Sequence, residues 1–243
     1  MAPPLVAVAH GSRDPRSAAS IAALLDVLRA TEPGLDVRAA FLDLSAPRLP
    51  DVLSTLAAEG HREAVIVPLL LGSAFHARVD LPALVAEAHS RFPRLSVTVS
   101  DVLGPDDRLS TVALRRVVAA GARLNDPGLG IVLAGAGSSH TPANEAVAAV
   151  AAAWERRFPV AGVRAAFASA TDPDVPAAIE SLRAAGARRI AVASWFLAPG
   201  RLPDRVANLA GPDALVADPL GDAPEIAALI VDRYLESAAV VAA

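Results

Sequence analysis

An internal repeat with a period of 126 residues limits this chain to few folds. The segment Val37–Phe41 reads Val-Arg-Ala-Ala-Phe, and the same five residues stand 126 positions later, at Val163–Phe167. The same offset relates several turn-forming residues: Gly11-Ser12 to Gly137-Ser138, Pro47 to Pro173, Pro50 to Pro176, and Gly60 to Gly186. Solenoid repeats are about 20 to 50 residues long, so this longer period, seen twice, predicts two homologous domains.

A cluster of turn-forming residues marks the junction between the two repeats. The segment 124–128 reads Leu-Asn-Asp-Pro-Gly, which is typical of a linker. We therefore expect domains at residues 1–125 and 126–243. Near the ends of the repeats the offset shortens to 117, where Asp101–Gly104 resembles Asp218–Gly221.

Short apolar runs alternate with stretches of helical periodicity throughout both repeats. This alternation predicts βα units on a parallel sheet, and the nearly continuous apolar runs indicate helices on both faces. Strands are expected near residues 5–9, 37–42, 64–71, 97–103, 130–134, 163–168, 190–197 and 214–217. Helices are expected near 15–30, 47–59, 81–91, 107–123, 142–158, 173–185, 203–209 and 224–237. The predicted fold class is α/β, with two flavodoxin-like domains that each hold a parallel four-stranded sheet flanked by helices.

The composition excludes several classes of function. The 243 residues include no cysteine, so thiol catalysis, disulfides and iron–sulfur clusters are excluded, and any metal must bind nitrogen or oxygen. The net charge of −4 lacks the basic character typical of nucleic-acid binding. No apolar run reaches the roughly 18 to 20 residues that span a bilayer, and the first residues do not read as an export signal. We expect a cytoplasmic protein with no nucleic-acid or membrane partner.

Two histidines follow predicted strands in the first repeat. His10 comes directly after the first strand, and His76 follows the third strand by five residues. In flavodoxin-like order these strands are neighbours at the switch point, where ligands of open α/β sheets bind. Neighbouring strands lie about 4.8 Å apart, so both imidazoles can bind one ion. Two ligands leave open coordination positions, as a metal in transit or a catalytic metal requires; the alternative for each histidine is capping or packing.

Polar residues near the same strand ends are candidates for substrate contacts. Ser12 and Arg13 stand where a helix begins, a place that favours carboxylate or phosphate groups, although Ser12 alone is equally consistent with a helix cap. Arg78 and Arg201 follow the third strand of each half and could add positive charge. Asp43 and Asp80 could orient a histidine or carry protons away, with capping as the alternative for both.

The remaining histidines point less clearly to a function. His61 and His89 are expected on the solvated surface. His140 stands at a helix start, where it is either an ordinary polar residue or a substrate contact. The segment 135–140 begins like a dinucleotide fingerprint but has histidine in place of the third glycine, and the chain has neither a Walker loop nor a nucleophile elbow.

The two histidine segments resemble those of a known enzyme family. The opening Leu5–Arg13, which ends His-Gly-Ser-Arg, the segment Val67–Pro82, and Leu103-Gly104 are similar to sirohydrochlorin chelatases of the CbiX/SirB type, members of the class II chelatases. The resemblance covers essentially the whole chain in the long, two-domain form of the family. It implies insertion of Co2+ or Fe2+ into the tetrapyrrole sirohydrochlorin, without ATP, on the route to cobalamin or siroheme.

The resemblance also assigns roles to residues. His10 and His76 become the pair that binds the metal and accepts protons. Because the implied substrate carries several carboxylates, its cleft should be locally cationic, and Arg13, Arg78 and Arg201 are the candidates for that task. Asp43 stands where the family often has glutamate. In the second half, Ala136 occupies the position of His10 and the segment 195–201 lacks histidine, so that half is expected to be catalytically silent and to wall a cleft between the domains.

Other functions stay open at this point. We expect a monomer that needs no cofactor beyond the substrate metal. The alternatives are a chelatase for another ion such as Ni2+ or for a related tetrapyrrole, a non-catalytic carrier of tetrapyrrole or metal, and an interaction module.

Overall fold

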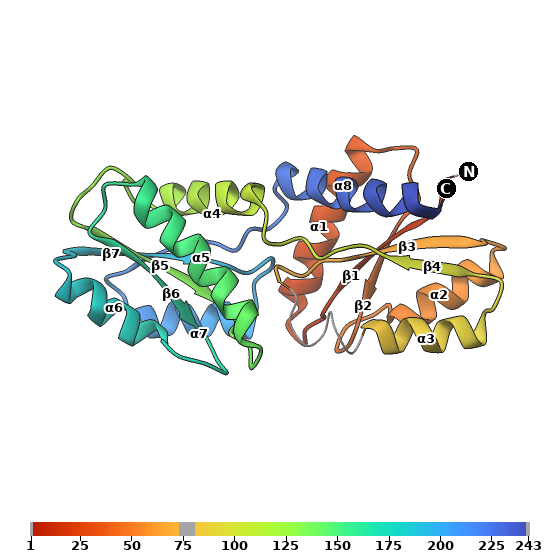
Figure 1. The fold of residues 1–243 in the computed structure, drawn as a ribbon, viewed down its shortest axis with the longest axis horizontal. Helices are drawn as coiled ribbons and strands as arrows, with labels where there is room; N and C mark the ends of the chain where they lie inside the picture. Colours follow the sequence, from red (N-terminus) through yellow and green to blue (C-terminus); the bar gives the residue numbers. More distant parts are fainter. Residues whose placement is uncertain (1, 73–80, 242–243) are drawn as a thin grey trace. The chain divides into compact units, whose positions relative to one another are not determined.

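The computed structural model describes residues 2–72 and 81–241, in which strands and helices alternate strictly (Figure 1). The first half of the chain comprises β1 (Leu5–Ala9), α1 (Pro15–Thr31), β2 (Val37–Phe41), α2 (Leu49–Ala58), β3 (Glu63–Pro68), α3 (Leu81–Arg91), β4 (Ser96–Val99) and α4 (Asp107–Ala119). The second half comprises β5 (Leu129–Gly135), α5 (Thr141–Arg157), β6 (Gly162–Phe167), α6 (Val175–Ala184), β7 (Arg189–Ser194), α7 (Arg201–Ala210), β8 (Leu215–Val216) and α8 (Pro224–Val241).

The strands form two parallel sheets of the same topology. Their orders are β2-β1-β3-β4 and β6-β5-β7-β8, and every pairing is parallel. The central strands β1 and β5 are buried along their whole length, as a sheet covered on both faces requires. The predicted fold class, two flavodoxin-like α/β domains, is therefore confirmed.

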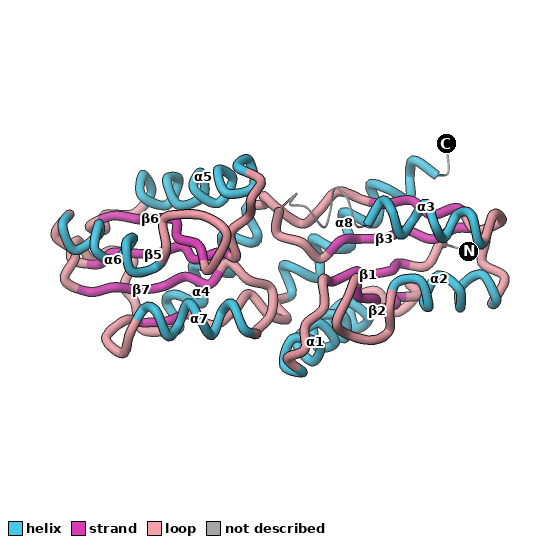
Figure 2. The backbone as a smooth tube through the Cα atoms, turned by 90° about the horizontal axis from the view of Figure 1, so that it is seen from below, coloured by secondary structure: helices cyan, strands magenta, loops and turns pink. Residues whose placement is uncertain are grey.

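Helices cover both faces of each sheet (Figures 1 and 2). In the first sheet α1 and α8 pack against each other on one face, and α2 and α3 pack together on the other. In the second sheet α4 and α5 cover one face, and α6 and α7 cover the other. The buried side of α1 shows why such helices form: Ile21, Leu24, Leu25 and Leu28 recur at helical spacing and face the core.

The last helix of each repeat packs in the other compact unit. Helix α4 follows β4 in the chain but contacts β7, whereas α8 follows β8 but contacts β3, β4 and α1. The two compact units are therefore residues 1–104 with 221–243, and residues 105–220. These units differ from the expected segments 1–125 and 126–243 by the exchange of α4 and α8. A repeat records the order of elements along the chain, and it carries no information about which sheet each helix covers.

Hydrogen bonds fix the exchanged helix α8 to the first unit. Tyr234 Oη donates to the carbonyl of Pro3 at 2.8 Å, and Arg233 Nε donates to the carbonyl of Val102 at 3.1 Å. The chain crosses between the units at the two related segments that the shorter offset marks. Leu103 and Leu220, which match within those segments, are both fully buried.

Several strands are shorter than the apolar runs that predict them. The run 64–71 forms a strand only to Pro68, and the run 97–103 forms one only over Ser96–Val99. Past these ends the chain is still buried, since Leu69 is 4% exposed and Leu103 is 0% exposed. Burial selects apolar residues in loops as well as in strands, so an apolar run overestimates strand length. Within the described ranges, no helix is long and apolar enough to cross a bilayer.

Candidate functional site

The carboxyl edge of the first sheet places His10 at the switch point of the fold. Strand β1 pairs with β2 on one side and β3 on the other, so the loops after these strands meet at one edge. His10 follows β1 directly, and its side chain is exposed. The imidazole is therefore accessible at the place where open α/β sheets bind ligands.

The main chain of His10 is held by the end of β2. The Leu42 N–H donates to the carbonyl of Ala9 at 3.0 Å, and the Asp43 N–H donates to the carbonyl of His10 at 2.9 Å. These bonds continue the parallel ladder past the last residues of both strands. The backbone position of His10 is thus fixed by the sheet, although the residue lies in a loop.

Gly11 allows the loop after β1 to touch the loop after β2. Its φ is +94°, and a Cβ at this position would lie 1.7 Å from the carbonyl oxygen of Asp43. No side chain fits in that space, and the left-handed backbone itself disfavours other residues. The two loops can approach this closely only with glycine here.

Ser12 is held by hydrogen bonds to Ser45, in the loop after β2, and to Asp14, two residues along its own loop. Its N–H donates to Ser45 Oγ at 3.0 Å, and Ser45 Oγ donates to the carbonyl of Ser12 at 2.9 Å. The Ser12 hydroxyl accepts from the Asp14 N–H at 3.1 Å. Helix α1 is capped by Asp14, whose carboxylate accepts from the Arg16 N–H, so the cap suggested for Ser12 belongs to Asp14 instead.

Arg13 and Asp43 lie in these same two loops. Arg13 is exposed beside Ser12. The carboxylate of Asp43 is also exposed and lies 3.2 Å from Arg48 Nη1 in an ion pair. Among the predicted site residues, the structure therefore brings His10, Ser12, Arg13 and Asp43 together.

Three predicted residues lie outside the described residues. His76, Arg78 and Asp80 fall between residues 72 and 81. The pairing of His10 with His76 at one ion stays a prediction from the sequence. In the two described ranges, no cluster of three or more histidine and carboxylate side chains could hold a metal ion.

The second unit repeats the loop architecture without the histidine. Ala136 stands at the position of His10, and Gly137 again has a positive φ of 83°. A Cβ on Gly137 would lie 1.9 Å from the carbonyl oxygen of Ser169, which matches Asp43 in the repeat. Ser138 is held by a single side chain here as well, since its N–H donates to Asn144 Oδ1 at 2.9 Å and its carbonyl accepts from Asn144 Nδ2 at 2.7 Å.

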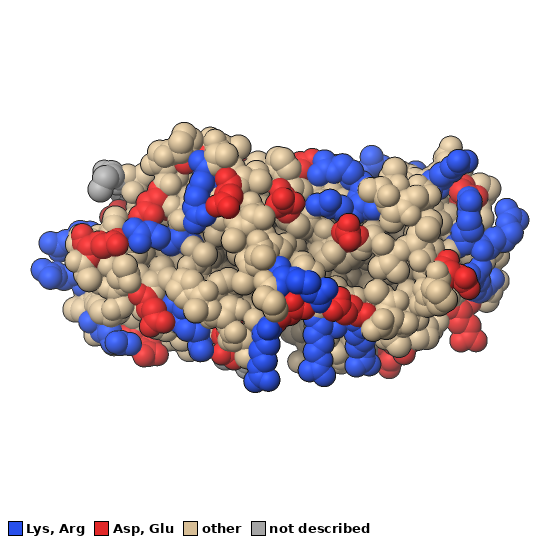
Figure 3. Space-filling view, turned by 180° about the vertical axis from the view of Figure 1, so that it is seen from behind, with Lys and Arg blue, Asp and Glu red and all other residues tan. Residues whose placement is uncertain are grey.

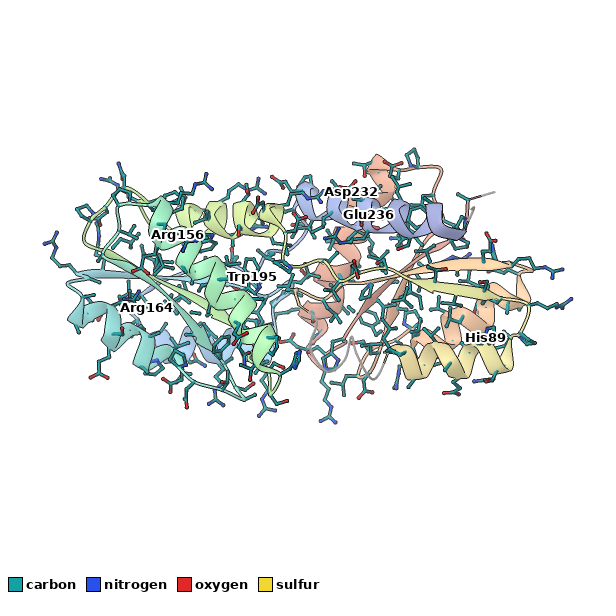
Figure 4. The ribbon with its side chains drawn as sticks, viewed as in Figure 1. His89, Arg156, Arg164, Trp195, Asp232 and Glu236 are labelled. Atoms are coloured by element: carbon teal, nitrogen blue, oxygen red, sulfur yellow. The ribbon has the colours of Figure 1, made fainter. Side chains whose placement is uncertain are left out.

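The other predicted contacts lie at the carboxyl edge of the second sheet. His140 is the N-cap of α5, makes no side-chain cap bond and is partly buried, while Arg201 opens α7 and is exposed. They follow β5 and β7, which pair directly, so both belong to the same edge of this sheet. Trp195, which follows β7, is only 5% exposed and belongs to the core (Figure 4).

The surface histidines lie away from this edge. His89 is exposed on α3, as expected (Figure 4). His61 is partly buried, with Nε2 at 3.6 Å from Glu59 Oε2. It precedes β3 and so lies at the amino edge, opposite to His10.

Charges of both signs surround the strand ends. The pKa of Asp14 is lowered, chiefly because its carboxylate accepts hydrogen bonds from the Arg16 side chain and also from the Arg16 N–H. An ionised carboxylate in this place favours the start of α1. On the face seen in Figure 3, arginines and carboxylates are interspersed.

Sequence reasoning did not find Ser45, Asp14 or Asn144. Ser45 and Asn144 hold the main chain of a neighbouring loop and Asp14 caps α1, and none of these structural roles matches a chemical motif. One signal was available for Ser45, because Thr171, another hydroxyl residue, stands 126 positions later.

Comparison with solved structures defines the class of this fold. SirB from Bacillus subtilis with Fe3+ superposes with a TM-score of 0.83 at 24% identity, covering 100% of this chain and 98% of that one. SirB from Bacillus subtilis subspecies spizizenii in complex with cobalt gives a TM-score of 0.78 at 21% identity, covering 98% and 96%. The chain therefore has the double α/β fold of these proteins.

Comparison with families and curated proteins is consistent with that class. The CbiX family model matches residues 4–120 and 130–237, so this chain belongs to the CbiX family. The sirohydrochlorin ferrochelatase of Bacillus subtilis is 24% identical over 238 residues, which cover 96% of this chain and 90% of that protein. The sirohydrochlorin cobaltochelatase of Priestia megaterium is 23% identical over 207 residues, covering 83% of this chain and 66% of that protein.

Proposed function

We propose that this chain is a sirohydrochlorin chelatase, which inserts Co2+ or Fe2+ into sirohydrochlorin. The observation that carries the proposal is the exposed imidazole of His10 at the switch point of a CbiX-family fold. The names of the relatives, sirohydrochlorin cobaltochelatase and ferrochelatase, support the same reaction. The solved SirB proteins with Fe3+ and with cobalt support a site for these ions at this fold.

The reaction requires groups that bind a metal and accept protons. A divalent ion enters the macrocycle as two pyrrole N–H protons leave, so charge balances without a nucleotide or redox cofactor. A neutral imidazole can do both tasks near pH 7. We assign these tasks to His10 together with His76, whose motif the sequence analysis identified.

A site with a small number of protein ligands suits an ion that must be released. Imidazole nitrogen binds first-row ions such as iron and nickel, and a site with two such ligands leaves open positions for the pyrrole nitrogens. The metal here is a substrate, and no resident cofactor is proposed. Asp43 is assigned to orienting His10 or receiving its proton, from the neighbouring strand end.

The carboxylates of sirohydrochlorin require cationic partners. Arg13 is exposed three residues after His10 and can meet a carboxylate directly. Ser12, Arg78, Arg201 and His140 are assigned to the same task. The second half, with Ala136 in place of histidine, is assigned a silent role in holding the macrocycle. A cytoplasmic monomer completes the proposal.

Turnover separates this proposal from a carrier. Purified protein is mixed with a tenfold excess of sirohydrochlorin and Co2+ or Fe2+ under anaerobic conditions, and the absorption change of metallation is followed. A chelatase converts many equivalents faster than the spontaneous reaction, whereas a carrier perturbs the spectrum by no more than one equivalent. Parallel reactions with Ni2+ test the alternative metal.

A further inference from the structure

We infer that Ser45 is a positioning residue for His10. Its hydroxyl locks the loop 10–14 onto the end of β2 and so fixes the imidazole for metallation. The inference rests on the proposed function and extends it to a residue outside both histidine motifs.

The lock consists of two hydrogen bonds from one hydroxyl to one residue. Ser45 Oγ accepts from the Ser12 N–H at 3.0 Å and donates to the Ser12 carbonyl at 2.9 Å. A serine hydroxyl has one donor and two acceptor positions, so both bonds form at once. Two bonds to the same peptide segment restrict its orientation as well as its position.

The two residues before Ser12 are also held by the loop after β2. The carbonyl of His10 is already bound by the Asp43 N–H at 2.9 Å. The intervening Gly11 touches the Asp43 carbonyl so closely that no Cβ fits. With Ser12 held by Ser45, three consecutive residues are tied to the loop after β2, and the main chain of His10 cannot shift alone.

The loop that presents Ser45 has a strained backbone. Leu44 has a φ of 61°, and the Ser45 N–H bonds to the Asp43 carbonyl at 2.7 Å across it. Leucine rarely adopts this conformation, and such strain persists where the surroundings enforce it, often at functional sites. Leu44 is 45% exposed, so its own packing does not account for the turn.

The second unit serves as an internal comparison. Ala170 has a φ of 67°, and the Thr171 N–H bonds to the Ser169 carbonyl at 2.9 Å, so the same turn is present. There Thr171 Oγ1 donates to the carbonyl of Asp172 at 3.4 Å, in place of the Ser138 main chain. Ser138 is held instead by Asn144, which lies six residues further along the chain in the first turn of α5. In the second unit the Ser169 hydroxyl instead donates one bond across the two loops, to the carbonyl of Ala136 at 3.0 Å. Among the described residues, the two-bond arrangement of Ser45 on Ser12 therefore occurs in the half that carries His10, and a single hydroxyl bond joins the matching loops of the other half.

The test uses three variants of the full chain. Ser45→Ala removes both bonds, and we expect kcat for metallation to fall about tenfold to a hundredfold, because small displacements of a reacting group cost this much. We expect KM for sirohydrochlorin to change less than about threefold, because Arg78, Arg201 and His140, which are also assigned to the carboxylates, lie outside the loop 10–14 that Ser45 holds. Ser45→Thr keeps the hydroxyl, and Thr171 shows that this turn accepts threonine, so kcat should return to near the wild-type value. Thr171→Ala is the matched control and should behave as wild type.

A second measurement reports on the lock without turnover. Amide hydrogen exchange at Ser12 should accelerate in Ser45→Ala and stay slow in Ser45→Thr. If Ser45→Ala does not fold, Ser45→Cys keeps the size, weakens both bonds, and should show the same kcat loss to a smaller degree.

The outcomes separate the inference from the proposed function. A wild-type protein without turnover refutes the proposed function, and the role of Ser45 in metallation with it. A wild-type protein with turnover, together with a Ser45→Ala variant within twofold of it in kcat, overturns only the positioning role. Failure of Ser45→Thr to restore kcat in a folded protein also overturns it.

Discussion

Gly11 shows how one residue without a side chain fixes the geometry of the site. It holds a left-handed backbone and leaves no room for a Cβ against Asp43. The approach of the two loops at the carboxyl edge depends on this position. Gly60 offers a comparison, because it has a similar φ of 88° but open space around its Cβ position.

Alanine substitutions at Gly60 and Gly11 separate the cost of a left-handed backbone from the cost of a steric clash. We expect Gly60→Ala to lower the free energy of unfolding by about 1 to 2 kcal/mol, the cost of a left-handed residue. Gly11→Ala must also displace the Asp43 carbonyl, and we expect it to cost at least about 3 kcal/mol and to impair metallation. Urea denaturation measures both values. Equal costs for the two variants would show that the loops do not touch as described.

The charge of Asp14 predicts a pH dependence. Hydrogen bonds from Arg16 lower the pKa of Asp14 below its ordinary value of 3.8. A carboxyl group with a lowered pKa in the folded state stabilises that state above about pH 3.8, and this contribution disappears as the pH falls through the folded-state pKa. Asp14→Asn keeps an acceptor for the helix cap but cannot titrate. Its unfolding free energy should therefore vary less with pH between about pH 4 and 2 than that of wild type; parallel profiles would contradict the assignment.

Single site residues were predictable from the sequence where a polar side chain follows a predicted strand. His10, Ser12, Arg13 and Asp43 were identified as polar residues at strand ends, and the structure places all four in two touching loops. Ser45 was not identified, because its role comes from a contact across 33 residues of sequence. The repeat offers only Thr171 at the matching position as a signal, and a hydroxyl that holds a backbone matches no motif of its own.

At the level of elements, the exchanged helix α8 is held by its buried face and by Tyr234. This tyrosine is 3% exposed, and its hydroxyl donates to the carbonyl of Pro3. Burial raises the pKa of Tyr234, consistent with a phenol kept neutral in the core. The bond ties the last helix to the first residues of the chain.

Removing that hydroxyl tests the packing of α8. Tyr234→Phe keeps the ring and leaves the Pro3 carbonyl without this donor, so we expect a loss of about 1 kcal/mol in unfolding free energy. Chemical denaturation of the variant and of the wild type measures the change. A variant as stable as wild type would contradict the contact.

The number and order of the helices and strands were predictable from the sequence, whereas the sheet on which each helix packs was less predictable. Periodicity identified each strand and helix because burial imposes it locally. The packing of α4 on β7 and of α8 on β3 depends on the path of the chain after Leu103 and Leu220, where the sequence shows only similar motifs.

At the level of the whole molecule, the exchange makes each unit depend on both halves of the sequence. Without α8, one face of β3 and β4 loses the buried side chains of Ile226, Leu229 and Ile230. The unit that carries His10 is therefore completed by the end of the chain.

Truncation tests this dependence. A chain ending at residue 220 should lose protection from hydrogen exchange in β1 and β3, while β5 and β7 keep theirs, because unit 2 spans residues 105–220. Uniform protection in both sheets after truncation would show that α8 is dispensable. Uniform loss would show that the units do not fold separately.

The central claim is that His10 takes part in moving a metal ion into sirohydrochlorin. The most direct measurement is the initial rate of Co2+ or Fe2+ insertion by wild type and by His10→Ala, with His89→Ala on α3 as the matched control. We predict that wild type and His89→Ala exceed the spontaneous rate, and that His10→Ala falls about a hundredfold or more while staying folded. A folded His10→Ala variant that metallates at the wild-type rate would contradict the account.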